Sequence, residues 1–177
     1  AVASRFFAVG AICIHVEGGV GAMSTQALVN PLHAIAAMPR FRAGEAPQAI
    51  IDSLLEGDPG RSQRQVHILD AQGRLAQHSG PDCVTWAGTV KGENVSVAGN
   101  MLAGPQVVQA TLDGFLAATG TLTERLLTAM ETGEAAGGDK RGKQSAALKI
   151  CTADPYPDLD IRSDDHPDPL ADLRRLY

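Results

Sequence analysis

A glycine-rich, charged segment is the most unusual stretch of this 177-residue sequence. Gly133–Gln144 reads GEAAGGDKRGKQ and places Asp139, Lys140, Arg141 and Lys143 close together. Glycine-rich backbone beside cations can form a concave site for a carboxylate or phosphate. The segment therefore predicts that Arg141 holds a substrate carboxylate and that Asp139 orients Arg141. The alternative is a solvated loop after a helix, where cations also suit the helix dipole.

Small polar side chains near expected strand ends form a second group of candidates. Ser24, Thr25 and Gln26 close a strand of small residues, and Asn100 lies between a strand and a helix. Hydroxyl and amide groups at such places can line a site or stabilise an oxyanion. The alternative is structural, with Thr25 satisfied locally in a packed strand and Asn100 capping a turn.

The histidines give little support for a metal centre. His67 and His78 are expected to lie diagonally on one face of a hairpin, but no third ligand accompanies them. The segment Asp164–Asp168 (DDHPD) resembles a metal-binding run in composition. Acidic residues and proline at a helix start explain that segment more simply. We therefore predict no metal site, and the sequence implies no cofactor.

These candidates need a scaffold, which hydrophobic periodicity and turn residues outline. Strands are predicted at 1–4, 11–17, 20–26, 65–69, 74–78, 85–90, 93–98, 145–151 and 159–162, with a proline-rich connection at 154–157. Helices are predicted from Pro31 toward Pro39, from Pro47 to Gly57, from Pro105, after Thr121, and from Pro169 with Asp168 as its N-cap. Thr121 and Glu124 spell a capping box.

The order of these elements predicts one α+β domain over residues 1–177. Two pairs of helices are separated by blocks of strands, which suggests two sheets, each covered by one helix pair.

Composition excludes several classes of protein. Apolar residues make up 44% and charged residues 20% of the chain, which is ordinary for a globular fold and not for a disordered one. Residues 151–177 carry seven Asp against three Arg, and the remainder is nearly neutral, so we expect no nucleic-acid partner. Apolar runs are too short for a membrane span, and three scattered Cys suit a reducing cytoplasm.

Five motifs in register resemble the bacterial family known as domain of unknown function 1028. They are Val20–Gln26 (VGAMSTQ), Asp58–Arg61 followed by Arg64–Val66, Gly99–Pro105 (GNMLAGP), Ala136–Leu148, and Asp164–Pro169 (DDHPDP). The resemblance covers nearly the whole chain. It implies kinship with the Ntn hydrolases, whose fold is a four-layer αββα sandwich.

The same resemblance implies an activity, namely amide-bond hydrolysis by an N-terminal Thr, Ser or Cys. This chain begins with Ala1, and the family has a strand before the segment that resembles 1–4, so we expect this domain to lack its first N-terminal strand. Proteasome-type peptidases carry an Asp and a Lys where this chain has Ala3 and Ala11, which argues against proteasome-like threonine chemistry.

Two functions therefore stay open. The first is a hydrolase that cleaves an amide or related C–N bond in a small anionic substrate. Its predicted catalytic residues are Ser4, Thr25 and Asn100, and its predicted substrate-binding residues are Gln26, Asp139, Arg141 and Gln144. The second is a non-catalytic protein on the same fold that binds a small metabolite or assembles with itself. We expect a homo-oligomer, a dimer, in either case, because related sandwiches commonly assemble.

Overall fold

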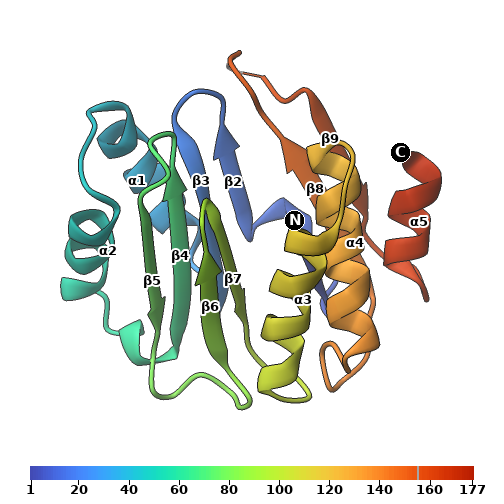
Figure 1. The fold of residues 1–177 in the computed structure, drawn as a ribbon. Helices are drawn as coiled ribbons and strands as arrows, with labels where there is room; N and C mark the ends of the chain where they lie inside the picture. The colour runs from blue at the N-terminus through green and yellow to red at the C-terminus, as the bar shows by residue number, and fades with distance from the viewer. Residues whose placement is uncertain (155) are drawn as a thin grey trace.

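The protein has a mixed α+β fold with antiparallel sheets (Figure 1). The computed structural model describes residues 1–154 and 156–177, which form nine strands and five α-helices. The predicted proline-rich connection includes residue 155, which lies outside the described residues. Among the described residues, each α-helix is too short or too polar to cross a lipid bilayer.

A four-stranded sheet is formed within the first half of the chain. Its order is β2 (Ile14–Glu17), β3 (Gly21–Ala27), β4 (Arg64–Asp70) and β5 (Leu75–Ser79). The strand predicted from residue 11 begins only at Ile14, because Val9–Ala11 form a 3₁₀ turn that leads into it. The hairpin β4–β5 pairs Leu69 with Leu75 and His67 with Gln77.

The remaining strands form two further hydrogen-bonded groups. One is β1 (Val2–Ser4), β8 (Ser145–Ile150) and β9 (Leu159–Ser163), in the order β1-β8-β9. The other is the hairpin of β6 (Gly88–Gly92) and β7 (Val95–Gly99). The described strands thus make three separate sheets and not the two predicted, because no ladder joins β7 to β1.

Helices α1 (Pro31–Arg42) and α2 (Pro47–Glu56) cover one face of the four-stranded sheet (Figure 1). The Asn30 side chain accepts a hydrogen bond from the Leu32 amide and so caps α1. The helix runs through Pro39 to Arg42, beyond the predicted end. The core beneath it consists of Met23, Ala34, Ala37, Phe41, Ile50, Ile51, Leu55, Val66, Ile68 and Ala76.

Helices α3 (Pro105–Ala117), α4 (Leu122–Ala135) and α5 (Pro169–Leu176) cover the other strands. Helix α3 packs on β6 and β7, α5 packs on β8 and β9, and α4 lies between α3 and α5. The predicted capping box is confirmed, since the Thr121 hydroxyl and the Glu124 carboxylate each accept the other's backbone amide. Asp168 caps α5 as predicted, by accepting from the Ala171 amide.

A buried glutamine connects the four-stranded sheet to the β6–β7 hairpin. Gln65 is fully buried, and the two hydrogens of its amide nitrogen are shared among three acceptors, Ser79 Oγ, Gly88 O and Gly99 O. Its Oε1 accepts from Gln26 Nε2 at 2.7 Å. The inward face of β3 and β4 therefore meets the hairpin through polar side chains, and these line the region described next.

Candidate functional site

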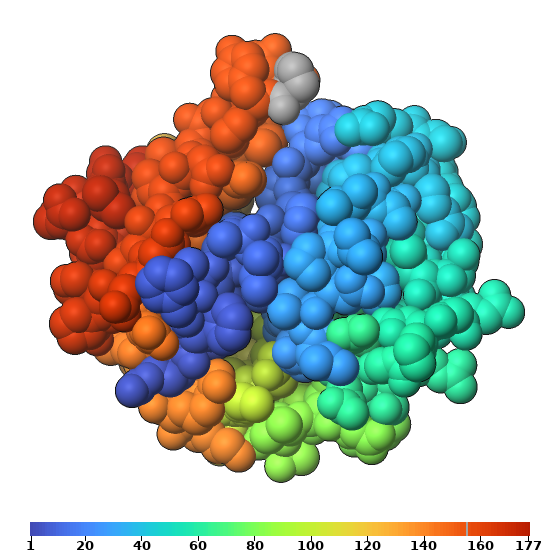
Figure 2. All heavy atoms as spheres, turned by 180° about the vertical axis from the view of Figure 1, so that it is seen from behind, coloured from blue at the N-terminus to red at the C-terminus, as the bar shows by residue number. Residues whose placement is uncertain are grey.

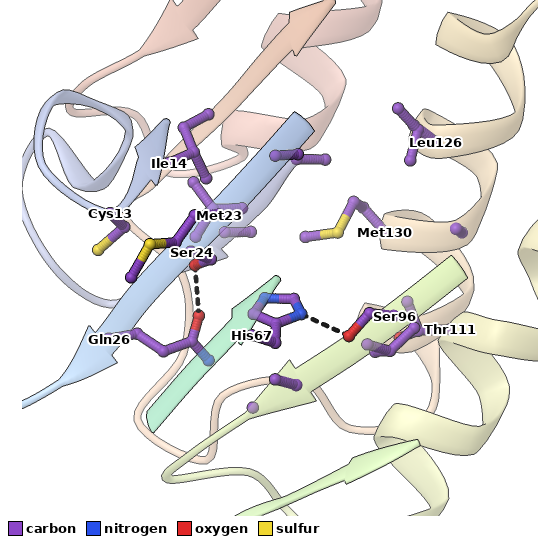
Figure 3. A pocket seen from close by; sticks show the side chains of 18 of the residues that line it. Cys13, Ile14, Met23, Ser24, Gln26, His67, Ser96, Thr111, Leu126 and Met130 are labelled. Atoms are coloured by element: carbon purple, nitrogen blue, oxygen red, sulfur yellow. Dashed lines mark hydrogen bonds between the residues drawn. The ribbon is translucent and has the colours of Figure 1, made fainter. Parts of the chain in front are cut away.

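A cavity of about 700 Å³ opens among β1, β3, β4, β7, α3 and α4. Apolar residues of its wall include Val2, Val97 and Phe115. Figure 3 shows Ile14, Leu126 and Met130 around the same space. Ser24, Gln26, His67 and Ser96 add polar atoms to this wall. Charged side chains also line the cavity, among them Glu17, Asp70, Glu134, Lys143 and Lys149.

Three predicted site residues meet at the margin of the cavity. Arg141 donates from Nε to Asp139 Oδ1 at 2.9 Å and from Nη2 to Asp139 Oδ2 at 2.5 Å. Ser4 Oγ donates to Asp139 Oδ2 at 3.3 Å and accepts from Arg141 Nη2 at 3.3 Å. All three residues line the cavity, although Ser4 is more than 130 residues away from the other two in sequence.

The backbone around Asp139 explains this convergence. Gly137 and Gly138 both have positive φ and turn the chain away from the end of α4. The turned segment then pairs with the Gly99–Pro105 motif, since Ala103 N donates to Gly138 O and Lys140 N donates to Met101 O. On the other side, Gln144 N donates to Ser4 O, which places β1 against the same segment. The glycine-rich segment is therefore ordered, and its backbone hydrogen bonds connect the Gly99–Pro105 motif to β1.

The Ser4–Asp139–Arg141 cluster keeps its charges. Burial raises the pKa of Asp139, but hydrogen bonds from Arg141 and from the Arg5 amide outweigh burial, and the pKa lies below its usual value. The hydrogen bonds to Asp139 raise the pKa of Arg141. Asp139 occupies Nε and Nη2, whereas Arg141 Nη1 has no hydrogen-bond partner among the described residues. One edge of the guanidinium is thus free for an anion.

Two further predicted residues, Gln26 and Asn100, also line the cavity. Thr25 and Gln144 are not among the residues that line it. Side chains alternate along a strand, so Gln26 faces β7 while Thr25 faces α1, where its Oγ1 accepts from the Asn30 amide. Gln144 Nε2 donates to Asp165 at 3.1 Å, outside the cavity.

The structure corrects the prediction for the two hairpin histidines. His67 pairs with Gln77 and Val66 pairs with His78, so His67 and His78 lie on opposite faces of the sheet. A shift of one residue in the register moves a side chain to the other face, and the predicted register differs by that one residue. His67 lines the cavity, whereas His78 Nε2 lies 3.1 Å from Arg61 O on the outer side. No three His, Cys, Asp or Glu side chains converge as metal ligands within residues 1–154 and 156–177.

Sequence analysis missed the polar group around His67. His67 Nδ1 lies 2.7 Å from Ser96 Oγ, and Gln77 Nε2 donates to the same oxygen at 2.8 Å. The three residues come from β4, β7 and β5, and only the packing of the β6–β7 hairpin on the sheet brings them together. The alternation of side chains along β4 could have placed His67 on the same face of the sheet as Gln65.

Comparison with known proteins identifies the family. Residues 1–173 match the model of the family described as "Family of unknown function (DUF1028)". The chain belongs to the DUF1028 family. The resemblance predicted from the five motifs is thereby confirmed at the level of the family.

A solved DUF1028 structure has the same fold. The crystal structure of protein SPO2555 from Silicibacter pomeroyi, a DUF1028 protein, superposes with a TM-score of 0.92 at 29% identity. The alignment covers 99% of this chain and 76% of that chain. No curated protein matches the sequence significantly.

Proposed function

We propose that this DUF1028 protein binds a small anionic molecule, with a carboxylate on Arg141. The observation that carries the proposal is the free edge of the Arg141 guanidinium, whose other edge is held by Asp139. Asp139 fixes the other edge of the guanidinium, so little side-chain freedom is lost when an anion binds.

The proposed architecture is the four-layer αββα sandwich of the Ntn hydrolases. Its support is the packing order, in which α1 and α2 cover one sheet and the β6–β7 hairpin lies on the opposite face of that sheet. Helix α3 in turn covers the hairpin. In this arrangement the cavity lies between the two strand layers.

Binding can be tested with straight-chain carboxylates of four to ten carbons, measured by isothermal titration calorimetry. Arg141→Ala is expected to weaken binding about 10- to 150-fold, the scale of one charged hydrogen bond. Arg61→Ala is the matched control, because Arg61 is exposed on the outer side of the sheet and does not line this cavity. Equal affinities in wild type and Arg141→Ala would remove Arg141 from the site.

A second proposal is hydrolysis of an amide or related C–N bond in the bound anion. The specific observation is the Ser4 hydroxyl, which lies 3.3 Å from Arg141 Nη2 and from Asp139 Oδ2 at the cavity. Acyl transfer requires a nucleophile that is hydrogen-bonded to a base. Asp139 Oδ2 would accept the Ser4 proton as the hydroxyl oxygen bonds to the acyl carbon, the proton would pass to the leaving amine, and water would then release the acid. The resemblance to Ntn hydrolases supports the reaction class.

Release of free amine from N-acyl amino acids, followed by chromatography, tests hydrolysis. We expect Ser4→Ala to abolish release while calorimetry still detects binding. Binding without any release in wild type would leave only the non-catalytic function. The roles predicted for Gln26 and Asn100, which line the cavity, are tested in the same assay by alanine variants.

A further inference from the structure

Helix α1 is apolar on both of its faces. One face packs on the four-stranded sheet and buries Ala34, Ala37 and Phe41. The only polar side chain between residues 31 and 39 is that of His33, and it is buried as well. The opposite face is exposed and consists of Leu32, Ile35, Ala36 and Pro39. A helix that is apolar all round is normally covered on all sides.

The neighbouring helix α2 has the ordinary pattern of a surface helix. It lies beside α1 on the same sheet (Figure 1) and contributes Ile50, Ile51 and Leu55 to the same core. Its exposed face, in contrast to that of α1, carries the polar residues Gln48, Asp52, Ser53 and Glu56. The outer face of α1 is therefore suited to contact with another apolar surface rather than with water.

The exposed apolar residues of α1 form a continuous ridge. Positions 32, 35, 36 and 39 are three or four residues apart, so they share one side of the helix. Leu28 just before the helix and Ala43 at its C-cap are also exposed and extend the series at both ends. We call these six residues the α1 ridge: Leu28, Leu32, Ile35, Ala36, Pro39 and Ala43.

The charges beside the α1 ridge are balanced within the chain. Arg40 Nε donates to Glu45 at 2.7 Å, and Arg42 Nε donates to Glu17 at 2.5 Å. These arginines are therefore engaged and do not form the free cationic border that holds an interfacial helix on anionic lipid. The net charge of −5 would also oppose binding to an anionic membrane. A partner that is itself apolar and locally uncharged fits this surface, and a second α1 ridge has that character.

The α1 ridge is complementary to itself when two copies run in opposite directions. A two-fold axis midway between residues 35 and 36 places Ile35 of one copy opposite Ala36 of the other. The same axis places Leu32 opposite Pro39, and Leu28 opposite Ala43. Each larger side chain then meets a smaller one, which lets the two helices approach closely and interdigitate.

We propose that α1 is the centre of a homodimer interface, in which it packs antiparallel on α1 of a second copy with Ile35 and Ala36 at the two-fold axis. The contact is isologous, because the same ridge serves both copies, and it closes at two subunits. None of the six ridge residues lines the cavity that Arg141 borders. Association and anion binding can therefore be tested separately.

Disulfide cross-linking of the 177-residue chain tests the interface and its register. Ala36→Cys should give a covalent dimer on mild oxidation, because the two-fold axis brings residue 36 of both copies together. Leu32→Cys and Pro39→Cys should not cross-link when each is oxidised alone, since equivalent residues would lie about 10 Å apart along the helices. An exchanged mixture of these two variants should cross-link.

Two controls accompany the cross-linking. Ala49→Cys is the matched variant, because Ala49 is an exposed alanine of α2, and it should not cross-link. Wild type gives the background of its own cysteines, of which Cys13 and Cys83 are buried and Cys151 is partly exposed. Cross-linking of Leu32→Cys alone, or of Ala49→Cys as readily as Ala36→Cys, would overturn the proposal.

Sedimentation equilibrium gives a test that needs no oxidation. Ala36→Glu should weaken association at least about 100-fold relative to wild type, because the axis brings the two introduced carboxylates together. Ala49→Glu should leave association unchanged. Circular dichroism checks that both variants stay folded, which is expected because both alanines are exposed. An Ala36→Glu variant that associates like wild type would overturn the proposal.

Flotation with phosphatidylglycerol vesicles distinguishes the lipid alternative. Wild type should be dimeric and should not float with the vesicles. A monomeric wild type would overturn the proposal, and flotation of that monomer would assign the α1 ridge to a lipid surface instead.

Discussion

Asp58 shows how one residue of the Asp58–Arg61 motif acts, at the scale of a single side chain. Its buried carboxylate accepts from Arg64 Nε at 2.7 Å, from His33 Nε2 at 3.1 Å and from the Gly60 amide at 2.8 Å. The hydrogen bond from Arg64 is the main reason that the pKa of Asp58 is lowered to about 2. His33 is neutral at pH 7, because burial lowers its pKa. The motif therefore joins the end of α2 to the start of β4 through a buried carboxylate.

The depressed pKa of Asp58 predicts a defined dependence of stability on pH. A group whose pKa falls on folding stabilises the protein above its unfolded pKa, and this contribution is lost as pH falls through the folded pKa. The window is therefore from about pH 4 to about pH 2. Within it, wild type should lose about 2 kcal/mol of unfolding free energy from this group.

The variant Asp58→Asn should lack that loss and be less stable than wild type at pH 7 by about 2–4 kcal/mol, since Arg64 is left buried without a counter-charge. Urea unfolding followed by circular dichroism at pH 7, 4 and 2.5 measures both effects. Asp113→Asn is the control, because Asp113 is exposed on α3. A constant difference between wild type and Asp58→Asn across the three pH values would contradict the assignment.

At the scale of elements, helices α3 and α4 depend on a close approach at Gly133. A Cβ atom added at Gly133 would lie 2.1 Å from Thr111 Oγ1, which itself donates to Val107 O at 2.8 Å. Both Thr111 and Gly133 line the cavity, so the spacing of the two helices also sets its width.

Gly133→Ala should therefore destabilise the protein by about 1–3 kcal/mol through overpacking, although alanine gains about 1 kcal/mol in helix propensity. A double-mutant cycle with Thr111→Ala isolates the contact. In the Thr111→Ala background the same glycine change should cost much less or become stabilising, as measured by urea unfolding. An equal cost in both backgrounds would place the strain elsewhere.

At the scale of the whole molecule, one face carries several exposed apolar side chains. They are Phe6, Phe7, Leu28, Leu32 and Ile35, with exposed fractions from 47% to 67%. Figure 2 shows the segment after β1 and the start of α1 together on this face. Exposed apolar groups gathered in this way are typical of an association surface, and we propose that the predicted dimer forms through this face.

Sedimentation velocity tests the dimer. Wild type should sediment as a dimer at micromolar concentration, and Leu32→Glu together with Phe7→Glu should sediment as a monomer, because each would bury a charge in the interface. Leu122→Glu changes an exposed leucine at the start of α4 and should leave the dimer intact. A monomeric wild type would contradict the proposal.

Local patterns in the sequence predict the elements whose ends are marked by capping residues and prolines. The capping box of Thr121 and Glu124, the Asp168 cap and the prolines that begin α1, α2, α3 and α5 all lie where they were predicted. These interactions span three or four residues, so they are visible in sequence. Five motifs in order also sufficed to indicate the DUF1028 family. Arg141 and Asp139 were predicted partners because they are two residues apart.

Contacts between residues far apart in the sequence follow from the packing of the folded chain. A shift of one residue in the pairing of β4 with β5 would move a side chain to the other face of the sheet. The observed register places His67 inside the cavity and His78 outside it. Ser4 reaches Asp139 because β1 pairs with β8, and Ser96 reaches His67 because the β6–β7 hairpin packs on the sheet. Periodicity specifies which face of a strand is apolar, but not which strand lies opposite. That choice depends on packing of the whole core, which no local pattern in the sequence contains.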